Sequence, residues 1–229
     1  MIKFFRHLRK SINDIYYYIL SKYYKLILII LLSVSCKGQT TTNAERQVGG
    51  PCQDCEALLD YKLLNELPRS IDTLSGFIKN EPKIKITGTV YEIDGKTPAE
   101  NILIYIYHVD RNGLYQPSEN PIGWEKRHGQ YRGWLKTNND GEFTFYTFRP
   151  ASYPGVQEPE HIHIYVKESN TIPYYIDSCL FESDSLLTEE AKQSQNNRGG
   201  SGIIKLKKEN GILTANRDII LGLNIPDYN

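Results

Sequence analysis

The chain lacks several features that would place it in a protein class at once. Its 229 residues carry 27 basic and 27 acidic side chains, so no excess of positive charge points to a nucleic acid. The longest apolar run covers residues 26–32, which is too short to span a bilayer comfortably. Cysteine is scarce: the chain has four, and they form one Cys-x-x-Cys pair, so no second pair is present to complete a zinc ribbon. We find no internal repeat.

Residues 1–35 have the composition of an export signal. Six Lys or Arg residues precede the apolar run, and the small residues 33–35 follow it, as in a secretory signal peptide. The alternative is an uncleaved N-terminal anchor that reaches back through the Tyr-rich stretch 16–24. Residues 1–35 hold six of the 27 basic and one of the 27 acidic residues, which leaves 21 and 26 and a net charge of −5. This balance predicts binding to neither nucleic acid nor anionic lipid headgroups.

The four cysteines separate into three predicted roles. Cys36 directly follows the small residues and resembles the lipidated Cys of the bacterial lipobox, which implies export to the cell envelope with the lipid as the only membrane contact. Cys52 and Cys55 form a Cys-x-x-Cys, which in an exported protein favours a local disulfide over a redox dithiol. Cys179 is expected to be a small buried residue.

Composition divides the chain into three parts: a signal segment at 1–35, a tether and N-terminal helical region with the Cys-x-x-Cys at 36–82, and a β domain at 83–229. Residues 37–50 are small and polar, as in flexible tethers. Leucine spacing predicts a short helix over 56–65, and a second is expected over 186–195.

From residue 83 the pattern is that of β-strands. Residues 102–109 are apolar on both faces, which predicts a strand buried in a sandwich. Asn139-Asp140-Gly141 predicts a turn before an alternating strand at 142–148, and further strands are expected at 160–167, 203–208, 212–214 and 219–223. The fold class predicted is mainly β: an antiparallel β-sandwich with short helices.

The tripeptide His161-Ile162-His163 is a candidate metal site. Side chains alternate along a strand, so both histidines should emerge on one face, about 7 Å apart at Cα. Taken alone, an exposed strand face is an equally good explanation. With 17 tyrosines in the chain, a single tyrosine is also a poor ligand candidate without motif context.

Several short motifs follow one another between residues 84 and 168. They are residues 87–90, 94–99, 105–115, 131–134, 137–145 and 149–154, then Pro159-Glu160-His161-Ile162-His163. Their order and spacing resemble those of the intradiol ring-cleavage dioxygenases, which hold ferric iron in a β-sandwich. The resemblance implies Fe(3+) as cofactor, with Tyr115, Tyr153, His161 and His163 as its ligands. His108 and His128 are not expected to be ligands, although His128 is expected near the pocket.

The chemistry of the implied ligands suits ferric iron. Phenolate is a hard anionic donor, and a bound cation stabilises it although free Tyr has a pKa near 10. Neutral imidazoles supply the other protein donors. Four protein ligands leave positions for solvent and substrate, as catalytic metal sites require.

The resemblance implies that a catechol-type diol is cleaved with O2 between its hydroxyl-bearing carbons to give a dicarboxylic acid. Tyr153 is expected to accept a substrate proton. Glu158 stands three residues before His161, where the resemblance implies an arginine, so Arg132 or Arg149 is expected to supply the positive charge. The alternative function is a non-catalytic β-sandwich lipoprotein of the envelope that retains the fold as a binding module.

Overall fold

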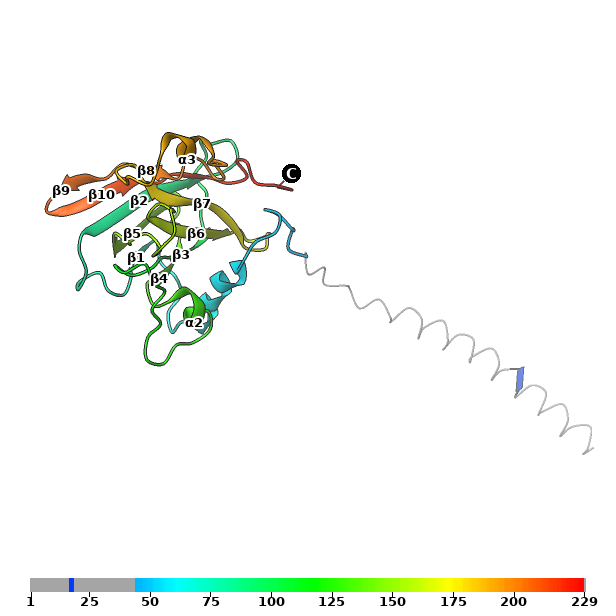
Figure 1. The fold of residues 1–229 in the computed structure, drawn as a ribbon. Coiled ribbons are helices and arrows are strands. Elements are labelled where there is room, and N and C mark those ends of the chain that lie inside the picture. Colours follow the sequence, from blue (N-terminus) through cyan, green and yellow to red (C-terminus); the bar gives the residue numbers. More distant parts are fainter. Residues whose placement is uncertain (1–16, 19–43, 229) are drawn as a thin grey trace, which may run out of the picture. The chain divides into compact units, whose positions relative to one another are not determined.

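The computed structural model describes residues 17–18 and 44–228 (Figure 1). Tyr17 and Tyr18 are helical, and residues Glu45–Asn229 form one compact unit. The expected lipidation site Cys36 and the expected signal segment 1–35, apart from Tyr17 and Tyr18, lie outside the described residues. Within the described ranges, no helix has the length and apolar character needed to cross a membrane.

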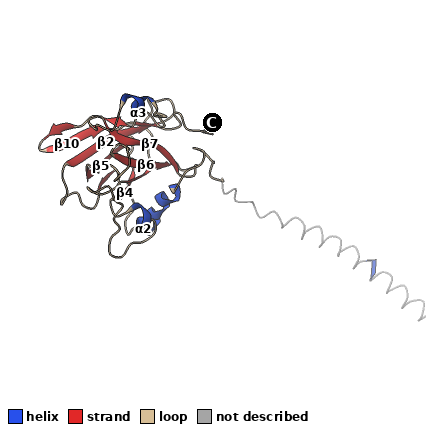
Figure 2. Ribbon diagram, in the orientation of Figure 1, coloured by secondary structure: helices blue, strands red, loops and turns tan. Residues whose placement is uncertain are grey.

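The compact unit consists of two β-sheets, with short helices at their margins (Figures 1 and 2). The first sheet has the order β1 (Ile71–Thr73), β5 (Glu142–Phe148), β2 (Lys83–Tyr91), β10 (Ile212–Asn216) and β9 (Lys207–Glu209), and β11 (Ile219–Ile220) also pairs with β2. The second has the order β4 (Arg132–Lys136), β3 (Leu103–Tyr107), β6 (His161–Lys167), β7 (Tyr174–Phe181) and β8 (Ile203–Ile204). The helices are the 3-10 helix η1 (Cys55–Leu63), α2 (Glu125–His128) and α3 (Glu189–Gln193).

The predicted mainly β sandwich is confirmed, but its purely antiparallel character is wrong. The pairs β1–β5, β2–β10, β2–β11 and β7–β8 are parallel, so both sheets are mixed. Parallel neighbours need a long connection, and the partners β2 and β10 are separated by most of the domain sequence. The sequence did not reveal the parallel pairs, because a tight turn indicates only how the two strands that it joins are paired.

The predicted elements agree with the structure best where the local pattern is strong. β5 has the predicted bounds, and β6 begins one residue later than predicted. The first predicted helix is a 3-10 helix, and α3 is shorter than predicted because it begins after Thr188, whose side chain accepts a hydrogen bond from the backbone N–H of Ala191.

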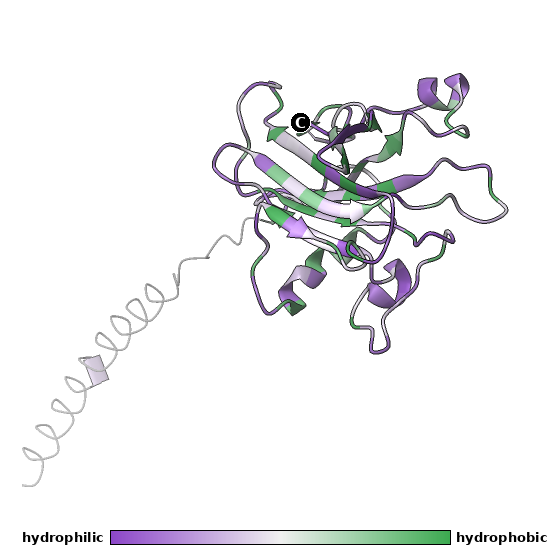
Figure 3. Cartoon of the chain, turned by 90° about the vertical axis from the view of Figure 1, so that its left-hand side faces the viewer, coloured by the Kyte–Doolittle hydropathy of each residue, from purple (hydrophilic) through white to green (hydrophobic). Residues whose placement is uncertain are grey.

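The main hydrophobic core lies between the two sheets. Figure 3 shows hydrophobic residues concentrated along the strands, whereas hydrophilic residues cover the short helices and many loops. Burial of one such aliphatic or aromatic side chain contributes about 1.5–3 kcal/mol. Alternate residues of facing strands form this core: Ile84 and Ile86 of β2, Phe143 and Phe145 of β5, Ile104 and Ile106 of β3, and Ile162 and Ile164 of β6.

A second, aromatic cluster covers the outer face of the second sheet. Tyr105, Tyr107, Trp134 and Tyr165 pack there against residues of η1. The Trp134 indole N–H donates to the Leu58 carbonyl oxygen at 2.9 Å, which fixes η1 on the sheet. The region from Glu45 to residue 82 is part of the same compact unit as the sandwich, and its helix η1 packs on the outer face of the second sheet.

Candidate metal centre

Strand β6 presents the two histidines of the candidate site on one face. Ile162 and Ile164 point into the core between the sheets, so His161 and His163 point to the outer face. On the neighbouring strand, Tyr107 pairs with His163, and the two rings stack with centroids 4.4 Å apart and planes 16° apart. The site therefore lies on the outside of one sheet, under the aromatic cluster.

The two candidate tyrosines come from two loops that are hydrogen-bonded to each other. Tyr115 follows β3, in a turn where the Asp110 carboxylate accepts backbone hydrogen bonds from Asn112 at 2.7 Å and Leu114 at 2.9 Å. Tyr153 lies between β5 and β6. The backbone N–H of Ala151 in that loop donates to the Asp110 carbonyl oxygen at 3.2 Å, so the two loops are held in a fixed relation.

Gly113 allows these loops to approach closely. Its φ is +78°, a conformation that favours glycine, and a Cβ there would lie 2.2 Å from the Ser152 carbonyl oxygen. The loop positions therefore depend on the absence of a side chain at Gly113.

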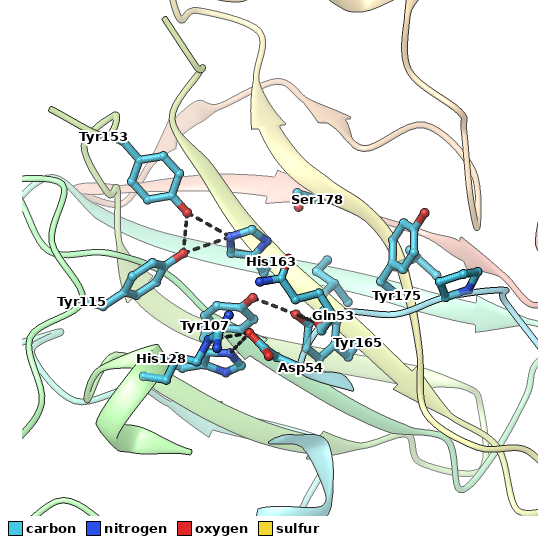
Figure 4. A pocket seen from close by; sticks show the side chains of 14 residues that line it. Gln53, Asp54, Tyr107, Tyr115, His128, Tyr153, His163, Tyr165, Tyr175 and Ser178 are labelled. Atoms are coloured by element: carbon cyan, nitrogen blue, oxygen red, sulfur yellow. Dashed lines mark hydrogen bonds and ion pairs between the residues drawn. The ribbon is translucent and has the colours of Figure 1, made fainter. Parts of the chain in front are cut away.

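The four side chains implied as iron ligands meet at their polar atoms. Figure 4 shows Tyr115, Tyr153 and His163 pointing toward one another. The Tyr115 Oη lies 2.5 Å from Tyr153 Oη and 3.0 Å from His163 Nε2, which is 3.3 Å from Tyr153 Oη. His161 Nε2 is 3.3 Å from Tyr153 Oη and 3.1 Å from His163 Nε2.

These separations suit donors around a single cation. Two atoms each bonded to a metal at about 2.0–2.1 Å lie about 2.9–3.4 Å apart for bond angles between 90° and tetrahedral. Four of the five separations fall within that range, and the fifth joins two phenol oxygens that are hydrogen-bonded to each other. The described residues contain no group of three or more His, Cys, Asp and Glu placed for a metal, because two of the four donors here are phenols.

The histidines are prepared to act as neutral donors. His161 Nδ1 donates to the Pro159 carbonyl oxygen at 2.7 Å, which leaves the lone pair on Nε2 facing the tyrosines. Burial, with a contribution from the nearby His161, lowers the pKa of His163 well below its usual value. Its imidazole is therefore neutral at pH 7 and able to bind a cation.

The tyrosines need a cation to ionise. Burial raises the pKa of Tyr115 and of Tyr153 above the usual value for phenol. Both phenols therefore stay protonated in the metal-free protein, and only a positive charge at the meeting point would make them anionic. A trivalent metal would provide this charge, so the donor set fits ferric iron.

A cavity of about 510 Å³ is lined by three of the four donor residues, Tyr115, Tyr153 and His163 (Figure 4). Within it, Tyr107 and Tyr165 are hydrogen-bonded through their hydroxyls at 2.8 Å, and Tyr165 donates to the Gln53 carbonyl oxygen at 2.9 Å. The cavity is lined by Pro51, Gln53, Asp54, Tyr107, Tyr115, Arg127, His128, Tyr153, His163, Ile164, Tyr165, Tyr175, Ile176 and Ser178.

An ion pair forms part of the cavity wall. The Asp54 carboxylate pairs with Arg127 Nε at 2.7 Å. His128 lines the cavity, accepts or donates a hydrogen bond with the Tyr105 hydroxyl at 3.0 Å, and stacks on Tyr107 with centroids 3.9 Å apart. Burial lowers the pKa of His128 to about 4, so at pH 7 it is a neutral wall residue.

The structure joins Cys52 and Cys55 by a disulfide, and the two residues between them contribute to the cavity wall. A loop this short still restricts the unfolded chain. We expect the double substitution Cys52→Ala and Cys55→Ala to lower the free energy of unfolding by about 2 kcal/mol. Urea denaturation measures this. Dithiothreitol should destabilise the wild type to the same degree and leave the double variant unchanged; equal midpoints for both proteins without reductant would refute the prediction.

Arg132 and Arg149 make ion pairs away from the four donors. Arg132 contacts the Asp60 carboxylate at 2.9 Å and lies 5.0 Å above the Trp134 ring, whereas Arg149 pairs with Glu160. Neither arginine is among the described residues that line the cavity. The cationic side chain in its wall is that of Arg127. His108 is buried in a different place, bonded to Thr147 Oγ1 at 2.7 Å.

Glu158 lies close to the donors. Its Oε1 is 4.0 Å from His161 Nε2, and its side chain is 48% exposed. Glu158, His161 and His163 line a second hollow of about 390 Å³, which shares four lining residues with the first cavity: His163, Tyr175, Ile176 and Ser178. The candidate centre is therefore bordered by space on two sides.

Comparison with known proteins agrees with this geometry at the level of fold. No family model matches the chain, and no curated protein matches it. The dioxygenase domain of a dioxygenase–carbohydrate-binding protein fusion from Streptomyces sp. SirexAA-E is 20% identical, with a TM-score of 0.50 over 67% of this chain and 87% of that one. An intradiol ring-cleavage dioxygenase from Tetranychus urticae is 16% identical, with a TM-score of 0.50 over 81% and 95%.

A third solved structure is longer than this chain. Catechol 1,2-dioxygenase from Acinetobacter sp. ADP1 is 16% identical with a TM-score of 0.48, and the match covers 67% of this chain and 57% of that one. The first two matches show that the chain has the β-sandwich fold of the intradiol ring-cleaving dioxygenases.

Proposed function

We propose that this protein is a non-haem Fe(III) intradiol dioxygenase that cleaves a catechol-type ring between its hydroxyl-bearing carbons with O2 to give a dicarboxylic acid. The observation that carries the proposal is the clustering of two phenol oxygens and two imidazole nitrogens, with five of their six separations between 2.5 and 3.3 Å. Two phenolates would offset two of the three charges of Fe(III) and favour it over Fe(II). This donor set would leave room for a substrate.

The residues of the site have separate tasks. Bound ferric iron would supply the Lewis acidity that holds the diol and makes its ring reactive toward O2. Tyr115, His161 and His163 would hold the iron, and Tyr153, on the loop before β6, would take a proton from the incoming diol. Tyr107 and Tyr165 line the cavity, and its volume of about 510 Å³ is typical of small-molecule sites.

The proposal extends to where the protein acts. Residues 1–35 and Cys36 support export and a lipid anchor on the bacterial cell envelope, with no other membrane contact. The partners would be a small aromatic diol and O2, and the net charge of −5 after residue 35 gives no reason to expect nucleic acid. A reaction that begins and ends with ferric iron needs no external reductant, which suits an exported enzyme.

Oxygen uptake tests the proposed activity. The purified protein, loaded with Fe(III), should be red-brown through phenolate-to-iron charge transfer and should consume O2 with at least one member of a panel of catechols. With ¹⁸O2, mass spectrometry should find both labelled atoms in a ring-opened dicarboxylic acid. A protein that stays colourless after loading with Fe(III) would refute the proposed ferric site. A coloured protein that consumes no O2 with any diol would favour the non-catalytic binding module.

A further inference from the structure

Glu158 is held beside the candidate centre by the chain itself. The next residue, Pro159, accepts the hydrogen bond from His161 Nδ1 at 2.7 Å, so the imidazole is fixed relative to the backbone that carries Glu158. Glu158 Oε1 lies 4.0 Å from His161 Nε2, the nitrogen that faces the tyrosines. The carboxylate is therefore placed at the metal-facing edge of the ring.

In the part of the chain that the structure describes, no Lys or Arg pairs with this carboxylate. Among the described residues, Glu158 has no hydrogen bond or ion pair other than its approach to His161, which would be neutral as a metal ligand. The nearby Glu160 differs, since its carboxylate pairs with Arg149 and its N–H donates to Asp184. Glu158 thus carries a half-exposed negative charge beside the donors that a bound cation would attract.

The Glu158 carboxylate is near the donors but not yet in a binding position. Adjacent donors around one metal lie about 3 Å apart, and the 4.0 Å distance from Glu158 Oε1 to His161 Nε2 exceeds this by about 1 Å, so Glu158 would bind only after a change of rotamer. The Glu158 side chain is 48% exposed, so rotamer changes have room. The second hollow, which Glu158 lines with His161 and His163, provides the open side for this approach.

We propose that Glu158 is a fifth, anionic donor to the metal held by Tyr115, Tyr153, His161 and His163. This inference rests on the proposed iron site. Two phenolates and one carboxylate would then match the three positive charges of ferric iron within the protein itself. The acidic residue at this position would thus form part of the centre, where the family resemblance implies an arginine.

Metal binding by Glu158→Gln tests the inference without measuring turnover. The metal-free wild type, Glu158→Gln and the control Glu209→Gln, on the exposed strand β9, are titrated with Fe(III) nitrilotriacetate while the charge-transfer band is recorded. Glu158→Gln should bind at least about tenfold more weakly. Its band should move to longer wavelength, because an amide gives less electron density to the iron. Glu209→Gln should match the wild type.

Each other outcome has a defined meaning. Equal affinity and an equal spectrum for Glu158→Gln and the wild type would overturn the proposal while leaving the four-ligand site intact. Weaker binding with an unshifted band would also overturn it, because that result describes a charge acting from a distance. A wild type that develops no band would overturn both this inference and the proposed function. Matching thermal unfolding of the three metal-free proteins checks that the fold is unchanged.

Discussion

Replacing Tyr115 by Phe should remove at least half of the charge-transfer absorption of the iron-loaded protein and weaken Fe(III) binding by more than about a hundredfold. The substitution removes one of two anionic oxygens from the donor set and keeps the ring that packs 5.9 Å from Tyr107, so the fold should persist. Because losing even an outer-shell partner costs a metal site about 10- to 100-fold in affinity or activity, O2 uptake should fall by at least that much.

Proton release gives an independent measure of the same variant. Burial holds Tyr115 and Tyr153 as neutral phenols in the metal-free protein, so binding of iron must release their protons. In weakly buffered solution, Tyr115→Phe should release one proton fewer per iron than the wild type. Tyr146→Phe is the matched control, because Tyr146 lies on β5 of the first sheet beside Phe77. An unchanged band and unchanged proton release in Tyr115→Phe would remove this residue from the metal site.

The elements that the sequence predicts well are those whose signal is local. Asn139-Asp140-Gly141 and the alternation of Phe143 and Phe145 define β5 to the residue, since turn chemistry and side-chain period agree there. The His-x-His pair is likewise local, because any strand places residues i and i+2 on one face. β1 was missed since a three-residue, mostly exposed strand carries no alternation to detect.

Contacts between distant segments could not be predicted in this way. The Gln53 carbonyl and the Tyr165 hydroxyl are 112 residues apart in sequence, and no local pattern connects the Cys-x-x-Cys loop with a cavity wall. The same holds for charged side chains, whose sequence position does not give their direction. Arg132 points to Asp60, a residue of η1, whose packing on the second sheet depends on the whole fold.

The convergence of the two tyrosines lies between these cases. The order of the motifs along the chain predicts which tyrosines are ligands. It does not predict that the two tyrosines meet, because their contact depends on Gly113. A Cβ at this position would lie 2.2 Å from the Ser152 carbonyl oxygen and 2.8 Å from Pro154 Cδ, and the φ of +78° is itself unfavourable for alanine. The loop that carries Tyr115 and the loop that carries Tyr153 can therefore touch only while residue 113 is glycine.

Gly113→Ala should consequently affect both stability and metal binding. The left-handed conformation costs about 1–2 kcal/mol for a residue with a side chain, and the contact with Ser152 adds to this, so the free energy of unfolding should fall by more than about 2 kcal/mol. If the loops separate to relieve the contact, the two phenol oxygens, 2.5 Å apart in the structure, move apart. Iron affinity should then fall at least about tenfold, because phenolate donors displaced by 1 Å no longer share the ion.

Two other glycines separate backbone strain from loop contact. Gly155, in the Tyr153 loop, has a φ of +76°, and Gly211, in the turn between β9 and β10, has a φ of +86°; a Cβ on either meets nothing within 4 Å. Gly155→Ala and Gly211→Ala should each cost only the conformational part, about 1–2 kcal/mol, and keep wild-type iron binding. Urea denaturation and iron titration of the three variants give both quantities. If Gly113→Ala behaves like these two controls, contact between the loops does not hold the tyrosines together.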